Sequence, residues 1–220
     1  MTERYKSVIW DWNGTLLDDA GYCVGITNQL LVRRELPPVD LPRYLDIFGF
    51  PLRDYCHQLG FDLEADTFEQ LSAEFMELYE AERSTCALRA GAVEVLTRLQ
   101  NTGVEQAILS AYRQQTLGEL VEHFELTGFF AYVVGVDNDF AEGKVELGAR
   151  WIEAAGWSRQ EAVLVGDTDH DLAVARAMGV DCVLVAGGHQ SRRRLKQCGV
   201  EVVAGLGEFF DLVQGKGGSS

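Results

Sequence analysis

Two patterns of apolar residues divide this chain. Short apolar runs, which predict buried strands, occur near its start and again after residue 90, where they alternate with segments of helical spacing. The predicted strands are residues 5–10, 104–109, 132–136, 162–165 and 182–185. The predicted helices of this part are residues 92–101, 114–123, 145–156, 170–178, 190–197 and 206–213. Strands that alternate with helices are typical of an α/β fold with a doubly wound, Rossmann-like parallel sheet.

Residues 19–86 follow a different pattern. Apolar residues recur at helical spacing in residues 20–34, 52–59 and 67–82, and prolines and glycines separate these segments. We therefore expect an all-helical domain inserted into the α/β core. The predicted organisation is a first core part at 1–18, the helical insert at 19–86, a second core part at 87–214 and a disordered tail at 215–220.

The composition limits the partners of the chain. Its 220 residues carry a formal net charge of −15, which disfavours nucleic acid or an anionic membrane surface as a partner. No apolar run approaches the roughly 18 residues that a membrane span needs. The five cysteines are scattered and no signal peptide opens the sequence, so we expect a cytoplasmic protein with reduced thiols. We expect a monomer or a homodimer, and we expect the four separated histidines to be surface or packing residues.

Carboxylates follow two of the predicted strands. Asp11 ends the first apolar run, Asp167 follows residues 162–165, and Asp171 lies about one helical turn further on. Parallel strands bring their carboxyl ends to one edge of a sheet, where ligands bind. Mg²⁺ prefers one or two carboxylates together with water and phosphate oxygens. The pattern therefore predicts a Mg²⁺ site at Asp11 and Asp167, supported by Asp171.

Groups suited to phosphate lie at the same predicted edge. Gly14 allows a sharp turn after Asp11, and the Thr15 hydroxyl can bind anionic oxygens. Ser110 follows a strand and Lys144 precedes a helix, where a hydroxyl and a positive charge can hold a phosphoryl group. Each residue alone also fits an ordinary turn, surface or capping role. Their joint occurrence in this order favours phosphoryl-transfer chemistry.

These motifs resemble the haloacid dehalogenase-like (HAD) hydrolase superfamily, in its phosphoglycolate-phosphatase-like branch. The resemblance covers residues 5–213, and the helical insert matches the cap domain of the family. Its carriers are Asp11-Trp12-Asn13-Gly14-Thr15-Leu16, Ser110, Lys144 and Gly166-Asp167-Thr168-Asp169-His170-Asp171.

The resemblance implies a mechanism and a role for each motif residue. Asp11 would attack the phosphoryl group and form an aspartyl-phosphate, and Ser110 and Lys144 would clamp that group. Mg²⁺ would bind the Asp11 and Asp167 side chains and the backbone carbonyl of Asn13, with Asp171 in support. The substrate would be a small phosphorylated metabolite, because an enclosing cap excludes bulk.

Residue 13 departs from the family pattern. Phosphatases of the family carry there a second aspartate that protonates the leaving group, whereas an asparagine amide cannot transfer a proton at neutral pH. Losing a general acid typically costs roughly 10²–10⁴-fold in rate. We therefore expect a slow phosphatase or a long-lived aspartyl-phosphate. The alternative is a catalytically impaired protein that binds Mg²⁺ and a phosphometabolite in a regulatory role.

Substrate contacts beyond the phosphate are expected from two places. The cap segment at 48–53 contains a Gly-Phe-Pro turn that could present Phe50 or Arg53 to the core. Ala111 and Arg113 follow Ser110 and are further candidates for binding the anion or the substrate. A simple inter-helix turn with a surface arginine explains the cap segment equally well.

Overall fold

A parallel sheet forms the core of the molecule. The computed structural model describes residues 5–137 and 143–214, and the predicted disordered tail at 215–220 lies outside these residues. Within them the main sheet has the order β5-β4-β1-β6-β7-β8, and all neighbouring strands run parallel. The strands are β1 (Ser7–Trp10), β4 (Glu105–Arg113), β5 (Tyr132–Val136), β6 (Ala162–Gly166), β7 (Asp181–Val185) and β8 (Glu201–Val203).

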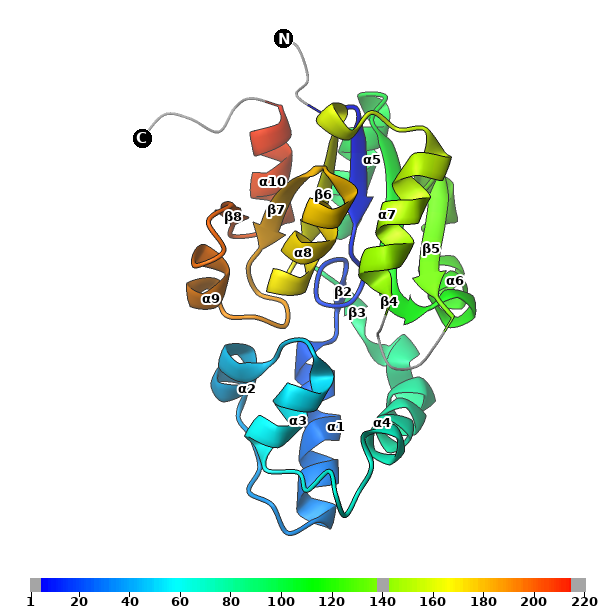
Figure 1. The fold of residues 1–220 in the computed structure, drawn as a ribbon. Helices are drawn as coiled ribbons and strands as arrows, with labels where there is room; N and C mark the ends of the chain where they lie inside the picture. Colours follow the sequence, from blue (N-terminus) through cyan, green and yellow to red (C-terminus); the bar gives the residue numbers. More distant parts are fainter. Residues whose placement is uncertain (1–4, 138–142, 215–220) are drawn as a thin grey trace.

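Helices cover both faces of this sheet, as the sequence pattern predicts (Figure 1). Successive residues of a strand point to opposite faces. On β1, Ile9 packs with residues of α7 and α8, whereas Trp10 packs on the other face against Phe209 of α10, with ring centroids 5.2 Å apart. The helices of the core are α5 (Ala92–Asn101), α6 (Gln114–His123), α7 (Lys144–Ala155), α8 (Asp169–Met178), α9 (Arg192–Lys196) and α10 (Leu206–Val213).

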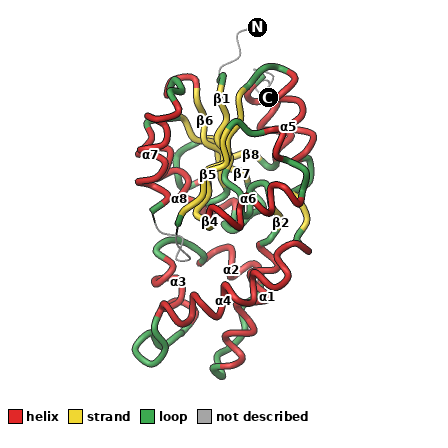
Figure 2. Tube along the Cα trace, turned by 90° about the vertical axis from the view of Figure 1, so that its right-hand side faces the viewer, coloured by secondary structure: helices red, strands yellow, loops and turns green. Residues whose placement is uncertain are grey.

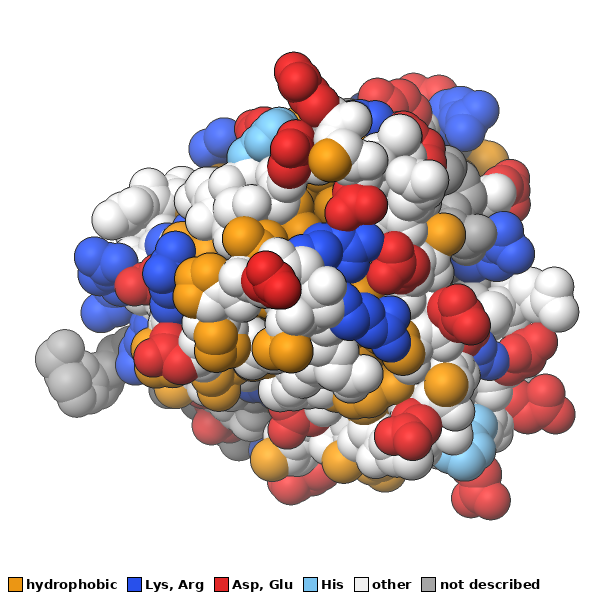
Figure 3. Space-filling model, turned by 90° about the horizontal axis from the view of Figure 1, so that it is seen from below, with side chains coloured by type: hydrophobic (Ala, Val, Ile, Leu, Met, Phe, Trp, Pro, Cys, Tyr) orange, Lys and Arg blue, Asp and Glu red, His pale blue; other side chains and the backbone are white. Residues whose placement is uncertain are grey.

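Four helices form the cap on the side of the carboxyl ends of the strands (Figures 1 and 2). Two short antiparallel strands, β2 (Leu17–Asp18) and β3 (Ala87–Leu88), connect the cap to the core. The cap helices are α1 (Ala20–Arg33), α2 (Leu41–Ile47), α3 (Leu52–Leu59) and α4 (Phe68–Glu82). Seen from the cap end, acidic side chains are spread over the outer surface (Figure 3). In the described part of the chain, each helix is too short or too polar to cross a bilayer.

Several elements differ from the sequence prediction: the short strands β2 and β3 were not predicted, and α9 is shorter than the predicted helix at 190–197. Helix α2 was not predicted, because Pro42 reads as a helix breaker; a proline in the first turn is tolerated, and the Asp40 side chain caps this helix. Strand β8 was not predicted, because its three residues are too few to show a clear apolar pattern. Strand β4 continues beyond Ser110 to Arg113 with a shift in its pairing to β5, so Ser110 does not end it as predicted.

The junction between β4 and α6 depends on a glycine in the neighbouring strand. A Cβ atom on Gly135 would lie 2.6 Å from the Tyr112 carbonyl oxygen and 2.8 Å from the Gln114 nitrogen. These are backbone atoms and cannot rotate away. We expect Gly135→Ala to lower the free energy of unfolding by about 1–3 kcal/mol, measured by urea denaturation. Gly128→Ala is the control, since its Cβ would meet nothing within 4 Å. Equal stability of the two variants would contradict this packing.

Candidate active site

Adjacent strands deliver the two predicted metal-binding aspartates to the same place. Trp10 lies opposite Val165 in the pairing of β1 with β6, and the Asp11 N–H donates to the Val165 carbonyl at 2.8 Å. Asp11 and Asp167 therefore leave neighbouring strands at the carboxyl edge of the sheet. This is the edge at which open α/β sheets bind their ligands.

Three buried carboxylates meet there around one ammonium group. The ligand oxygens of Asp11, Asp167 and Asp171 lie within 4.8 Å of one another. Lys144 is 2% exposed, and its Nζ donates to Asp11 Oδ1 at 2.5 Å and to Asp171 Oδ1 at 2.7 Å. The structure thus brings together four of the residues singled out in the sequence, on three separate segments of the chain.

The protonation of this cluster reflects its excess of acids. Burial raises the pKa of Asp11 to about 8; the Asp171 and Asp167 charges add to the shift and Lys144 opposes it. Burial also raises the pKa of Asp167, against the opposing effect of His189. For Asp171, burial is outweighed by the Lys144 ammonium and by hydrogen bonds from Lys144 and Thr168, so its pKa falls below the usual value.

The donor set fits Mg²⁺. Three hard carboxylate oxygens face one lysine, so a divalent cation would supply the positive charge that the cluster lacks. Asp11 and Asp167 could hold the ion directly, with Asp171 beside them.

Neighbouring backbone and hydroxyl groups fix the orientation of Asp167. Its Oδ2 accepts from the His189 N–H at 2.5 Å, and its Oδ1 accepts from the Thr15 hydroxyl at 3.0 Å. Gly14 has φ +71°, and a Cβ there would lie 2.2 Å from Asp167 Oδ2. Gly14 is required at this position because the loop passes so close to the carboxylate.

Thr15 and Gly14 thus support the carboxylates. The Gly14 N–H donates to Asp19 Oδ1 at 2.8 Å. Neither residue is among those that line the adjoining chamber. Their predicted contact with phosphate stays a prediction.

Asn13 belongs to a hydrogen-bond network that the sequence did not reveal. Its Nδ2 donates to Asp19 Oδ2 and to the Tyr79 hydroxyl, both at 2.8 Å, and the Tyr79 hydroxyl donates to Asp19 Oδ2 at 2.8 Å. His189 Nε2 lies 3.1 Å from Asp19 Oδ1, and His189 Nδ1 lies 2.8 Å from the Tyr44 hydroxyl. Both hydrogens of the Asn13 amide are thereby engaged.

The centre of this network is a buried ion pair. Burial would lower the pKa of His189, but Asp19 outweighs it and raises the pKa to about 9. Burial would raise the pKa of Asp19, but His189 and the surrounding donors hold it below the usual value. His189 therefore lies buried beside the carboxylate cluster, a charged position that the expectation of surface or packing histidines did not include. The only sequence signal was the acid pair at 18–19 after the first motif.

Asp19, Cys23 and His189 form a second group with potential ligand atoms within 4.8 Å of one another. Both Asp19 oxygens already accept hydrogen bonds, and His189 balances its charge. The carboxylates of Asp11, Asp167 and Asp171, which lack such a balance of charge, therefore fit a divalent cation better than this second group does.

A chamber of about 220 Å³ lies between these groups and the cap. Asp11, Lys144, Ser110, Ala111 and Arg113 line it on the core side. The Ser110 hydroxyl is buried and accepts from the Tyr112 N–H at 3.1 Å. One shared space is thus lined by Asp11 after β1, by three predicted residues of β4 and by Lys144 of α7.

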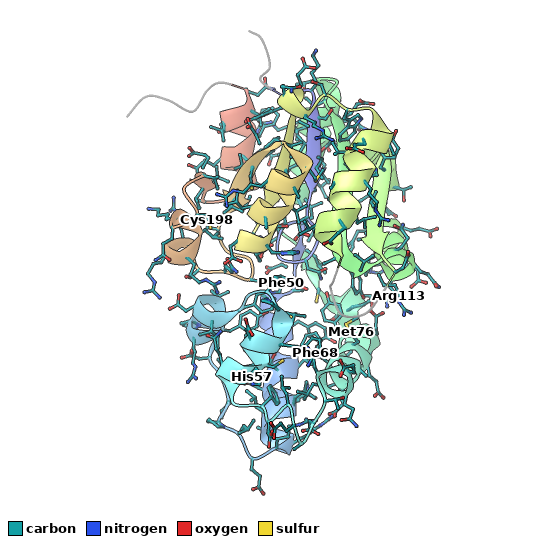
Figure 4. All side chains as sticks on the ribbon, viewed as in Figure 1. Phe50, His57, Phe68, Met76, Arg113 and Cys198 are labelled. Atoms are coloured by element: carbon teal, nitrogen blue, oxygen red, sulfur yellow. The ribbon has the colours of Figure 1, made fainter. Side chains whose placement is uncertain are left out.

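The structure places the two candidates of the cap segment, Phe50 and Arg53, in different surroundings. Phe50 lines the chamber and lies at the junction of cap and core (Figure 4). Arg53 does not line it: its guanidinium pairs with Glu69 at 2.6 Å and sits 4.6 Å from the centre of the Phe68 ring, on the exposed side of α3. The structure therefore gives Arg53 no contact with the predicted phosphate site.

Known proteins resemble this chain over most of its length. The phosphoglycolate phosphatase of Caulobacter vibrioides is 29% identical over 214 residues, which cover 94% of this chain and 88% of that protein. The phosphoglycolate phosphatase of Pseudomonas putida is 25% identical over 196 residues, covering 86% and 72%. The crystal structure of a predicted phosphatase from Clostridium acetobutylicum has a TM-score of 0.81 at 21% identity, covering 96% of this chain and 99% of that one.

These likenesses confirm the resemblance predicted from the motifs, and the shared fold confirms the α/β core with its helical cap. The model of the haloacid dehalogenase-like hydrolase family matches residues 8–185, from the first strand through the cap to β7. With the motifs in their expected places along that match, this chain belongs to the haloacid dehalogenase-like hydrolases.

Proposed function

We propose that this chain is a Mg²⁺-dependent phosphatase of small organic phosphate monoesters, and that Asp11 is its nucleophile. One observation carries the proposal: Asp11 lines the chamber between cap and core, and Lys144 donates hydrogen bonds to both Asp11 and Asp171. The similarity to phosphoglycolate phosphatases supports the same reaction class.

The residues of the site divide the chemistry among them. An Asp11 oxygen attacks phosphorus, the ester bond breaks, and an aspartyl-phosphate forms. The electron pair of the ester bond leaves on the alcohol oxygen, which takes its proton from water. Lys144 neutralises charge on the phosphoryl oxygens, and the Ser110 hydroxyl donates to one of them. Water then cleaves the bond between Asp11 and phosphorus and releases phosphate. Bound Mg²⁺, held by Asp11, Asp167 and the Asn13 carbonyl, would screen the negative charges that otherwise repel the substrate.

Residue 13 limits the expected rate of ester cleavage. The Asn13 amide already donates both its hydrogens to Asp19 and Tyr79, and it has no proton to give a leaving group. Catalysis therefore proceeds without a general acid from this position. The same feature favours the second candidate function, a protein that binds Mg²⁺ and a phosphometabolite without useful turnover.

The first test is phosphate release from a panel of aryl, sugar and small-acid phosphates in the presence of MgCl₂. We expect slow release by the unaltered chain and none by Asp11→Asn, which keeps the size of the side chain but removes the nucleophile. Mass spectrometry after acid quenching should show one added phosphoryl group on Asp11. Equal activity of Asp11→Asn would contradict the proposed nucleophile. Mg²⁺-dependent binding without release or adduct would select the second function.

The second test concerns residue 13. Asn13→Asp introduces the missing acid, and we expect turnover of an alkyl phosphate to rise by up to roughly 10²–10⁴-fold. Asn13→Ala is the control, because it opens the same hydrogen-bond network without adding a carboxyl group. Steady-state kinetics that show the same rate for Asn13→Asp and the unaltered chain would remove residue 13 from the account.

A further inference from the structure

The cap side of the chamber is apolar over nearly its whole extent. Its wall is built mainly from aliphatic, aromatic and sulfur-containing side chains of the cap, to which Thr27 and Ser72 add two hydroxyl groups. The apolar side chains include Phe50, Leu52, Phe68, Leu71, Phe75 and Met76. Figure 4 shows Phe50 and Met76 near the junction of cap and core, and Phe68 further inside the cap. A leaving group that extends from the phosphate into the cap therefore meets hydrocarbon.

Aromatic rings continue this wall to the carboxylates. Phe50 stacks on His170 with centroids 4.3 Å apart and planes inclined by 27°. Phe48 lies 5.9 Å from Phe50 and 5.1 Å from His189. These flat rings offer faces and edges on which another aromatic ring can pack.

Charged groups of the lining concentrate at the core end. The described residues that line the chamber include one lysine, Lys144, and one arginine, Arg113, and neither belongs to the cap. Lys144 is engaged by Asp11 and Asp171, and Arg113 is an exposed residue at the end of β4. A second carboxylate on the substrate, as in phosphoglycolate, would face apolar side chains on the cap side, and burying an unpaired charge there is costly.

The absence of a general acid at Asn13 also restricts the leaving group of the substrate. Without a general acid, the ester bond breaks readily only if the departing oxygen is a weak base. Phenols have a pKa of roughly 10, the value of a tyrosine side chain. Aliphatic alcohols hold their proton far more tightly, as water does with a pKa of roughly 16.

We infer that the substrates of this site are phosphate esters of phenols, whose ring occupies the apolar chamber under the cap. This inference rests on the proposed function and specifies its substrate class. An Asp11 oxygen bonds to phosphorus as the bond from phosphorus to the aryl oxygen breaks. The electron pair leaves on the phenolate, which takes its proton from water. Water then attacks phosphorus, the Asp11 carboxylate is regenerated, and solvent takes the proton as inorganic phosphate departs.

Three substrates test separately the two observations that carry the inference, the missing general acid and the apolar wall of the chamber. Phenyl and cyclohexyl phosphate are similar in size and differ in the basicity of the leaving oxygen. Cyclohexyl phosphate and phosphoglycolate are both alkyl esters, and only the latter carries a carboxylate. We expect kcat/KM to fall from phenyl to cyclohexyl phosphate and again to phosphoglycolate, with at least about a tenfold difference between the first and the last.

A variant of the chamber wall tests where the ring binds. Met76→Gln keeps the length of the side chain but places an amide in the chamber, and kcat/KM for phenyl phosphate should fall by about tenfold. Ala73→Gln is the control, since it adds the same side chain at an exposed position of α4 that does not line the chamber. Met76→Leu, which stays apolar, should retain more of the preference for phenyl phosphate than Met76→Gln does.

The outcomes distinguish this inference from the proposed function. If phosphate release depends on Asp11 but phosphoglycolate is the preferred substrate, the inference is overturned and the proposed function stands. Loss of that preference in Arg113→Met would then show that Arg113 binds the substrate carboxylate. Cyclohexyl phosphate cleaved as fast as phenyl phosphate also overturns it. The absence of Asp11-dependent release from all three esters overturns the proposed function together with the inference.

Discussion

The buried contact of Lys144 with Asp11 and Asp171 is the interaction on which the site depends. Three carboxylates with oxygens within 4.8 Å of one another would repel strongly if all were ionised in a buried place. Lys144, at 2.5 Å and 2.7 Å from two of them, offsets part of that repulsion. Removing one partner of such a buried pair typically costs about 3–5 kcal/mol. In the proposed function, a cation and a phosphoryl group bind at this same cluster of charges.

A second buried ion pair joins the cap to the core. Asp19 lies at the start of the first cap helix, and His189 follows β7 in the core. Tyr79 of α4 and Tyr44 of α2 bond to this pair, so two cap helices are held to the core through it. Because Asn13 bonds to Asp19, this ion pair also contacts the loop two residues after Asp11.

The parts of the structure that depend on local pattern could be predicted from the sequence. Residues 52–59, 92–101, 114–123 and 206–213 are helices with the predicted bounds, because turn residues and apolar spacing mark their ends. Asp11 and Asp167 could be placed together because parallel strands share an edge. Asp19 and His189 could not, because neither directly follows a predicted strand of the sheet, so no shared edge indicates that they meet. The position of the Arg53 side chain could not be predicted either, since Arg53 pairs with Glu69 of another cap helix and does not line the chamber.

The central claim is that the carboxylates of Asp11 and Asp167 share one cation, and calorimetric titration of Mg²⁺ into the protein tests it most directly. We predict a single binding event that Asp167→Asn weakens by at least about tenfold, because the variant removes a charged ligand. Asp169→Asn is the matched control, since that carboxylate lies on the same turn but pairs with Arg194 at 2.9 Å. It should bind Mg²⁺ like the unaltered chain. Mg²⁺ binding that is unchanged by Asp167→Asn, or lost equally in both variants, would contradict the account.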